Sequence, residues 1–297
     1  MTLTSWEIAQ LLTRWLLYFG ISSVVGGLFS FCLLRQQSAL LSRIKGYVLG
    51  GALIGVAATI AYFFILVGGT MEEGLWLMFD PMMISIYWDS PAGNTLIANV
   101  IGYCLVIIAS LTLGSYRVFS LWPFSRLSLI VASLGIASLI YSFSLTGHAT
   151  EQAWYYQIIF FTHILIAAWW LGLLFPLWLI TRKATHQESS RILERFGELA
   201  AVAVLILIVC GTWMSYELTG WKGLLSSDYG FWLIVKLGLV AVILAMAAYH
   251  KLHLVPLILH RGNTRVIQKS ILTEKIVASS ILAVTAVFTT FVGPPIH

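Results

Sequence analysis

The chain has 297 residues, of which 59% are hydrophobic and 10% are charged. Because a water-soluble domain has roughly 25% charged residues, this composition excludes an ordinary soluble protein and indicates one that crosses a membrane several times. The net charge of +5 is spread over the loops between apolar segments. We therefore expect no nucleic-acid partner, and a lipid bilayer as the surroundings.

Eight apolar segments are each long enough to span a bilayer, for which a helix needs about 20 residues. We expect an all-α fold, a bundle of eight transmembrane helices forming a single transmembrane domain over 1–297. The predicted helices are 6–34, 46–69, 95–114, 126–146, 154–181, 196–219, 229–259 and 272–292. Glycines recur in the first two, and we expect Gly26-Gly27 and Gly46, Gly50, Gly51 and Gly55 to allow close helix packing.

The loops between these segments alternate in charge. Most of the 17 basic residues lie in one set of loops, whereas the other set holds most carboxylates and only Lys222 among basic residues. Basic loops face the cytoplasm, so both termini are predicted to be periplasmic in a multi-pass protein of the bacterial cell inner membrane. No basic cluster precedes the first segment, so we expect no cleavable signal sequence.

Two basic residues lie deep within predicted helices. Arg14 lies deep in the first segment, as Lys236 does in the seventh, and a cation in lipid needs a partner. Asp80, Glu217 and Asp228 are the nearest candidates by depth.

The outer loop after the second helix is rich in thioethers, which bind Cu⁺ well. A methionine-rich apolar loop lying on the membrane surface is the alternative. The candidate capture loop holds Met71, Met78, Met82 and Met83.

Two histidines bracket the outer corner between the fourth and fifth helices. His148 follows the fourth helix and His163 lies inside the fifth, about 13 Å along it at 1.5 Å per residue. Imidazole within a membrane indicates a functional site, and two of them suit a soft or borderline metal. A loop histidine and a helix-packing histidine form the alternative interpretation.

The sixth helix adds sulfur at a comparable depth. Cys210 and Met214 are four residues apart and share one helix face. With His148 and His163 they would complete a four-ligand soft metal site. Simple packing of both sulfur side chains against neighbouring helices is the alternative.

The inner ends of the last two helices hold further polar residues. Met246, His250 and His253 follow an i, i+4, i+7 spacing that would place them on one face as a candidate inner release site. Interfacial histidines reaching toward water are the alternative. Glu274 is close to the same interface, where we expect it to be solvated or paired with Lys275.

Several segments together resemble the copper resistance protein D family. They are Gly147-His148-Ala149, the run from His163 to Gly172, Arg14 with Tyr18 and Gly20, Lys236 to Val240, Glu274, and the closing Gly293-Pro294-Pro295. Two positions depart from the family pattern: Leu171-Gly172-Leu173 replaces a glycine pair, and the Tyr249-His250-Lys251 segment lacks the usual asparagine. The resemblance implies copper movement across the cytoplasmic membrane, usually import, with a periplasmic copper-binding partner.

We therefore expect a copper importer rather than an enzyme, because the sequence contains neither a nucleotide-binding motif nor an acid–base pair. Soft ligands favour Cu⁺ over Cu²⁺ as the bound ion. The alternative is a membrane haem protein with axial ligands from His148, His163 and either His250 or His253. In that protein Arg14 and Lys236 would hold the haem propionates.

Overall fold

The computed structural model describes residues 3–33, 38–71, 74–112, 126–146, 153–256 and 264–292. Within these ranges eight helices are long and apolar enough to cross a membrane, which confirms the expected number. They are α1 (Ser5–Leu33), α2 (Ser38–Met71), α4 (Pro91–Leu111), α5 (Arg126–Tyr141, extended by the 3₁₀ turn η2, Ser142–Ser144), α6 (Trp154–Lys183), α7 (His186–Ser226), α8 (Asp228–Tyr249, extended by η3, His250–Leu254) and α10 (Arg265–Phe291).

Three helices begin seven or more residues before their apolar segments. The sequence places these starts at 46, 196 and 272, whereas α2, α7 and α10 begin at Ser38, His186 and Arg265. Hydropathy detects only the part of a helix that lies in hydrocarbon, and the backbone continues helical through polar turns beyond it. Helix α7 changes direction at Gly220, which has a left-handed φ of 54°. Glycine adopts this conformation without a steric penalty, so the break falls at the predicted helix end.

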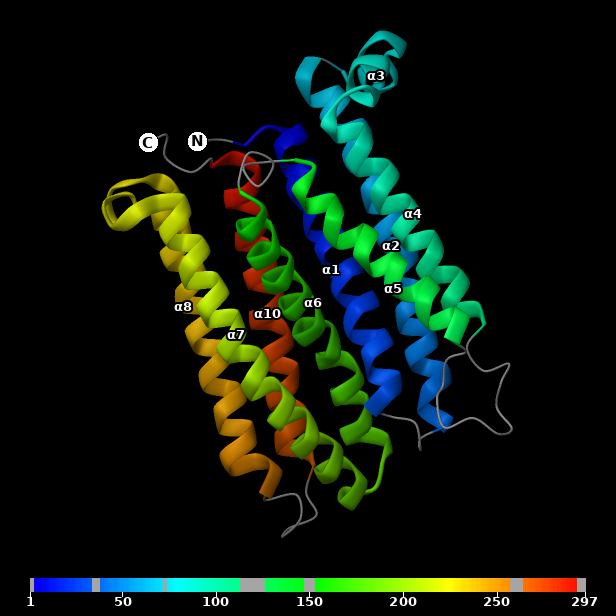
Figure 1. The fold of residues 1–297 in the computed structure, drawn as a ribbon, viewed down its shortest axis with the longest axis vertical. Coiled ribbons are helices and arrows are strands. Elements are labelled where there is room, and N and C mark those ends of the chain that lie inside the picture. The colour runs from blue at the N-terminus through cyan, green and yellow to red at the C-terminus, as the bar shows by residue number, and fades with distance from the viewer. Residues whose placement is uncertain are drawn as a thin grey trace.

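The loop between α2 and α4 is folded rather than irregular. It contains a 3₁₀ helix, η1 (Leu75–Phe79), and a short helix, α3 (Pro81–Trp88). The Asp80 carboxylate accepts a hydrogen bond of 2.9 Å from the Met83 amide, and Pro81 occupies the first helical turn. An aspartate cap followed by proline is a standard helix start. In Figure 1 this segment projects from one end of the bundle.

The helices form two groups of four that meet at α1. Helices α1, α2, α4 and α5 pack together, as do α6, α7, α8 and α10, and α1 contacts both α6 and α10. Figure 1 shows the two groups side by side, with the start of α1 and the end of α10 at the same end of the bundle. Helix α1 is the most enclosed of the eight.

Glycines bring α1 against its neighbours. A Cβ atom on Gly172 would lie 1.7 Å from the Ser22 carbonyl oxygen, and one on Gly26 would lie 2.3 Å from the Gly172 carbonyl carbon. The α1 and α6 backbones therefore touch, as the small residues led us to expect. Gly51 and Gly55 also face close neighbours on other helices. Gly46 and Gly50 have no atom within 4 Å of such a Cβ, so the expected packing role is wrong for these two.

The contact between α1 and α6 predicts a strong effect of one added methyl group. Gly172→Ala should lower the thermal unfolding midpoint of the purified protein, because helix separation costs roughly 1–3 kcal/mol. Gly50→Ala is the matched control, since its new methyl group meets open space. Equal midpoints for the two variants would contradict this account of the interface.

Candidate functional site

The group formed by α6, α7, α8 and α10 encloses several polar residues among apolar side chains. On α6, His163 shares a face with Trp170 and Leu174, which follow it at i+7 and i+11. On α8, Lys236 and His250 are fourteen residues apart on one face, about 21 Å at 1.5 Å per residue. Along the length of the bundle, the fold therefore places His163 and Lys236 in one half and His250 in the other.

His163 lies in the half of the bundle where α6 begins. A Cβ atom on Gly211 of α7 would lie 3.2 Å from its Cε1 atom and 3.6 Å from its Nδ1 atom, so α7 passes directly beside the ring. The Nδ1 atom is buried and has no hydrogen-bond partner among the described residues. An imidazole nitrogen left unpaired in a membrane interior is costly unless something binds it.

The sulfur residues lie on the same helix as Gly211. Cys210, its direct neighbour, is 8% exposed, and Met214 one turn further on is half-buried. Most residues of α7 are exposed on the surface of the bundle, and Cys210 and Met214 are among the few that are not. The described residues contain no group of three or more His, Cys, Asp or Glu arranged to hold a metal. His148 lies outside the described residues, and the four-ligand site stays a prediction.

The deep cations do not pair with the carboxylates that the sequence suggested. Arg14 donates 2.8 Å and 3.0 Å hydrogen bonds to the Thr289 carbonyl and the Thr290 hydroxyl on α10. Its guanidinium also lies 5.5 Å from the centre of the Tyr62 ring. Lys236 lies 5.3 Å from the Phe288 ring centre. Backbone carbonyls and aromatic faces thus replace carboxylates as partners of these cations.

The three suggested carboxylates have other surroundings. Asp80 caps α3, and Glu217 and Asp228 are exposed, Asp228 in the first turn of α8. Among the described residues, none of the three forms an ion pair with Arg14 or Lys236, so the predicted pairing is wrong. Carboxylates near a helix start are already stabilised by the free backbone amides there.

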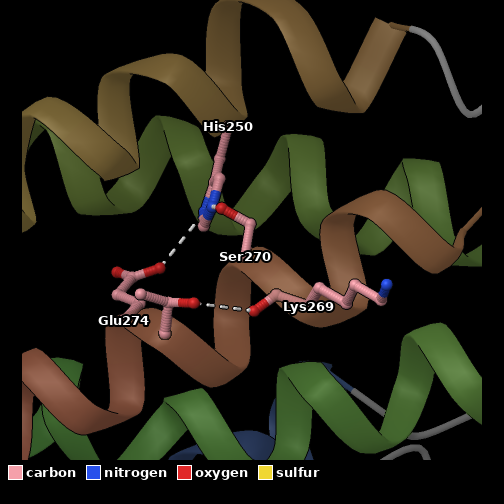
Figure 2. Close-up of polar contacts among 5 residues, drawn as sticks. His250, Lys269, Ser270 and Glu274 are labelled. Carbon is pink, nitrogen blue, oxygen red and sulfur yellow. Dashed lines mark hydrogen bonds and ion pairs between the residues drawn. The ribbon is translucent and has the colours of Figure 1, made fainter.

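A buried polar cluster that the sequence analysis missed lies at the other end of this helix group. The His250 Nδ1 atom is 3.1 Å from the Glu274 carboxylate, and its Nε2 atom is 2.5 Å from the Ser270 hydroxyl. The side chains of His250 and Glu274 are 12% and 4% exposed. Figure 2 shows His250 reaching from α8 to α10, while the neighbouring Lys269 points away.

Glu274 is therefore neither solvated nor paired with Lys275. The Lys275 ammonium instead lies 5.1 Å from the ring centres of both Phe175 and Trp178. The sequence contained a signal for the burial of Glu274, because it occupies a helical stripe of otherwise apolar positions. This buried stripe of α10 consists of Ile267, Ile271, Glu274, Ala278 and Ile281.

The helix type changes at the end of α8, where both histidines lie. Residues His250–Leu254 form a π-helix, in which the Val255 amide bonds the His250 carbonyl. His253 is exposed and stacks on Tyr249 with ring centres 5.2 Å apart, whereas His250 faces α10. Met246 is half-buried one turn earlier. The expected common face assumed α-helical spacing, which the π-helix interrupts.

A cavity of about 260 Å³ adjoins the cluster of His250 and Glu274. Its other walls are mostly apolar side chains of α6, α7, α8 and α10, among them Trp170, Leu174 and Val204. Because His163 precedes Trp170 by two turns on α6, the cavity lies between the two polar groups. His163 and His250 themselves are too far apart to serve as two axial ligands of one haem iron.

The methionines of the outer loop are distributed over η1 and α3. Met78 lies on η1, and Met82 and Met83 lie on α3, where Met82 is 74% exposed. The side chain of Met71 lies outside the described residues. An exposed thioether at the tip of the projecting segment is accessible to an ion arriving from solution.

The buried cluster predicts a stability effect at Glu274. Glu274→Ala should destabilise the purified protein by about 1–3 kcal/mol, because it leaves His250 without its acceptor. Glu274→Gln keeps one acceptor oxygen and should cost less, and Glu198→Ala on the exposed face of α7 is the control. Thermal unfolding in detergent measures all three. Destabilisation no greater than in the control would contradict the described pairing.

Residues 190–288 match the family model described as CopD, copper resistance protein D. No curated protein and no solved structure matches the chain significantly. The matched third of the chain covers α7 from Ser190, all of α8 and α10 to Phe288, and so includes Cys210, His250 and Glu274. Residues 190–288 are thus similar to copper resistance protein D, and the eight helices among the described residues that are long and apolar enough to cross a membrane support a multi-pass membrane protein.

Proposed function

We propose that this protein moves copper across the bacterial cytoplasmic membrane, from the periplasm to the cytoplasm. The observation that supports this most directly is the unpaired Nδ1 atom of His163, which is buried beside Gly211 of α7, the residue that follows Cys210 in the sequence. A neutral imidazole with a free nitrogen is a ready ligand for a soft or borderline ion, and copper is the ion that the family match implies.

The outer copper site is proposed to consist of His163 with Cys210, Met214 and His148. The two sulfur side chains lie within one turn of Gly211, the residue against the imidazole ring. Imidazole, thiolate and thioether together favour Cu⁺ over Cu²⁺.

The two polar groups would mark the start and the end of the copper route. Copper bound near His163 would pass the apolar cavity and reach Met246, His250 and His253 as the inner release site. The His250 ring is already held in place by Glu274 and Ser270, so an incoming ion would have to displace one of these contacts. Release would restore both contacts, which favours departure of the ion.

Charge distribution supports the proposed orientation and direction. The end of the bundle opposite the start of α1 carries most of the basic residues, which favours its placement in the cytoplasm. Met78, Met82 and Met83 would then face the periplasm and collect copper, either free or from a periplasmic copper-binding protein. An inside-negative membrane favours inward movement of a cation by about 2.3 kcal/mol per charge per 100 mV. Uptake would thus need no nucleotide.

Replacing the central imidazole tests the proposal. His163→Ala should abolish most copper uptake into vesicles of known orientation and remove about one copper ion per protein, because it removes the imidazole that lies beside Gly211 of α7. The control is His186→Ala, an exposed position at the start of α7 that belongs to neither proposed copper site. Elemental analysis and labelled-copper uptake are the measurements. Unchanged copper binding and uptake in His163→Ala would refute the outer site. Copper movement out of the cytoplasm would show that the protein exports copper. A Soret absorption band in the purified protein would show that it binds haem instead.

The sulfur ligands predict a graded effect. Met214→Leu keeps the side-chain volume but removes the thioether, and Cys210→Ser removes the thiol. Each should weaken Cu⁺ binding about tenfold or more while Ag⁺ responds in parallel, because both ions prefer sulfur. Cys104→Ser, an exposed thiol on α4 in the other helix group, is the matched control for loss of one sulfur atom. Competition titration against a Cu⁺ chelator measures the affinities, and unchanged values in both variants would remove sulfur from the site.

A further inference from the structure

A cleft lies away from the copper route, where the end of α6 meets the start of α2. It has a volume of about 410 Å³. Three basic side chains, Arg43, Arg182 and Lys183, line it together with Phe175 and Trp178. Arg43 comes from α2 and the others from α6, so two elements far apart in the sequence build the cleft.

Among the residues that the structure describes, the cations of this basic cleft have no carboxylate partners. Among the described residues, neither Arg43, Arg182, Lys183 nor the neighbouring Lys275 forms an ion pair. Arg182 instead lies 4.9 Å from the Trp178 ring centre, and Lys275 lies 5.1 Å from both rings. These contacts hold the cationic groups in place while leaving their positive charge uncompensated.

The aromatic floor of the cleft is itself fixed. Phe175 stacks on Tyr47 of α2 with ring centres 4.6 Å apart, and the Tyr47 hydroxyl donates to the Gly172 carbonyl. Phe175 and Trp178 lie 6.0 Å apart. The rings are therefore anchored to both helices, and the cleft is a built feature rather than a chance gap between flexible side chains.

The depth of the cleft matches the membrane interface. Arg182 and Lys183 occupy the last turn of α6, and Trp178 lies one turn deeper. Tryptophan at this level and basic residues just beyond it are typical of the region of lipid headgroups. Basic pockets between helices at this level bind anionic headgroups. A soluble anion would have no need of the apolar floor.

We propose that the basic cleft binds the phosphate of an anionic phospholipid. Arg43, Arg182 and Lys183 contact the phosphate oxygens, and the glycerol and first acyl carbons lie over Phe175 and Trp178. Guanidinium groups bind phosphate oxygens in pairs, which gives the site its preference for a phosphate over water. The bound lipid joins α2 to α6 and so strengthens the contact between the two helix groups. This proposal does not depend on copper transport.

Lipid titration of the full-length protein in nanodiscs or detergent tests it, with native mass spectrometry as the readout. Phosphatidylglycerol and cardiolipin should bind at least about tenfold more tightly than phosphatidylcholine, by the attraction of several cations at a membrane surface. Arg43→Gln combined with Arg182→Gln should remove that preference. Arg191→Gln combined with Arg195→Gln is the matched control, with the same charge loss on exposed α7 positions of the same end.

Each outcome decides the proposal. Loss of the preference in the cleft variant but not in the control supports it, provided that both variants unfold at the same temperature in phosphatidylcholine. Equal binding of all three lipids, or equal loss in both variants, overturns it. Displacement of phosphatidylglycerol by millimolar inorganic phosphate would overturn it as well, in favour of a soluble anion. A cleft variant that fails to fold is replaced by Lys183→Gln alone, judged by the same comparison.

Discussion

The backbone contact between α1 and α6 is the constraint on which the remaining structure depends. Gly26 and Gly172 allow these two helices to touch without side chains between them. In lipid no hydrophobic driving force holds helices together, so close packing must provide the attraction. Because α1 also contacts α10, this one interface positions the first helix group against the group that contains His163 and Glu274. If α1 and α6 were further apart, the packing around His163 and around Glu274 would loosen together.

The sequence predicted the helices well and their partners poorly, for a physical reason. Twenty apolar residues must be helical in a membrane, so the eight spans follow from hydropathy alone. Partner choice depends on rotation about each helix axis, which hydropathy does not encode. Arg14 therefore has a carbonyl and a tyrosine ring as partners where a carboxylate was expected. Glu274 shows the opposite error, since a residue expected at the surface is buried against His250.

The candidate site could be predicted only in part. His163 was identifiable because a histidine in a membrane helix is rare, and Cys210 and Met214 followed from their spacing. The cluster of His250, Ser270 and Glu274 joins α8 to α10 and includes residues twenty or more positions apart, so no local pattern reveals it. It lies wholly in the part of the chain that matches the copper resistance family, whereas His163 precedes that part. The matched region thus contains the cluster of His250, Ser270 and Glu274, together with the part of α7 that packs beside His163.

The π-helix at His250–Leu254 has a consequence for how polar groups are arranged in α8. A π-helical turn holds more residues than an α-helical turn, so two side chains three residues apart within it are rotated further from each other than they would be in an α-helix. That rotation lets one short segment serve two environments. His250 is turned to Glu274 inside the protein, and His253 three residues later is turned to the outside with Tyr249. A single helix end therefore presents a fixed imidazole and an accessible one to opposite surroundings.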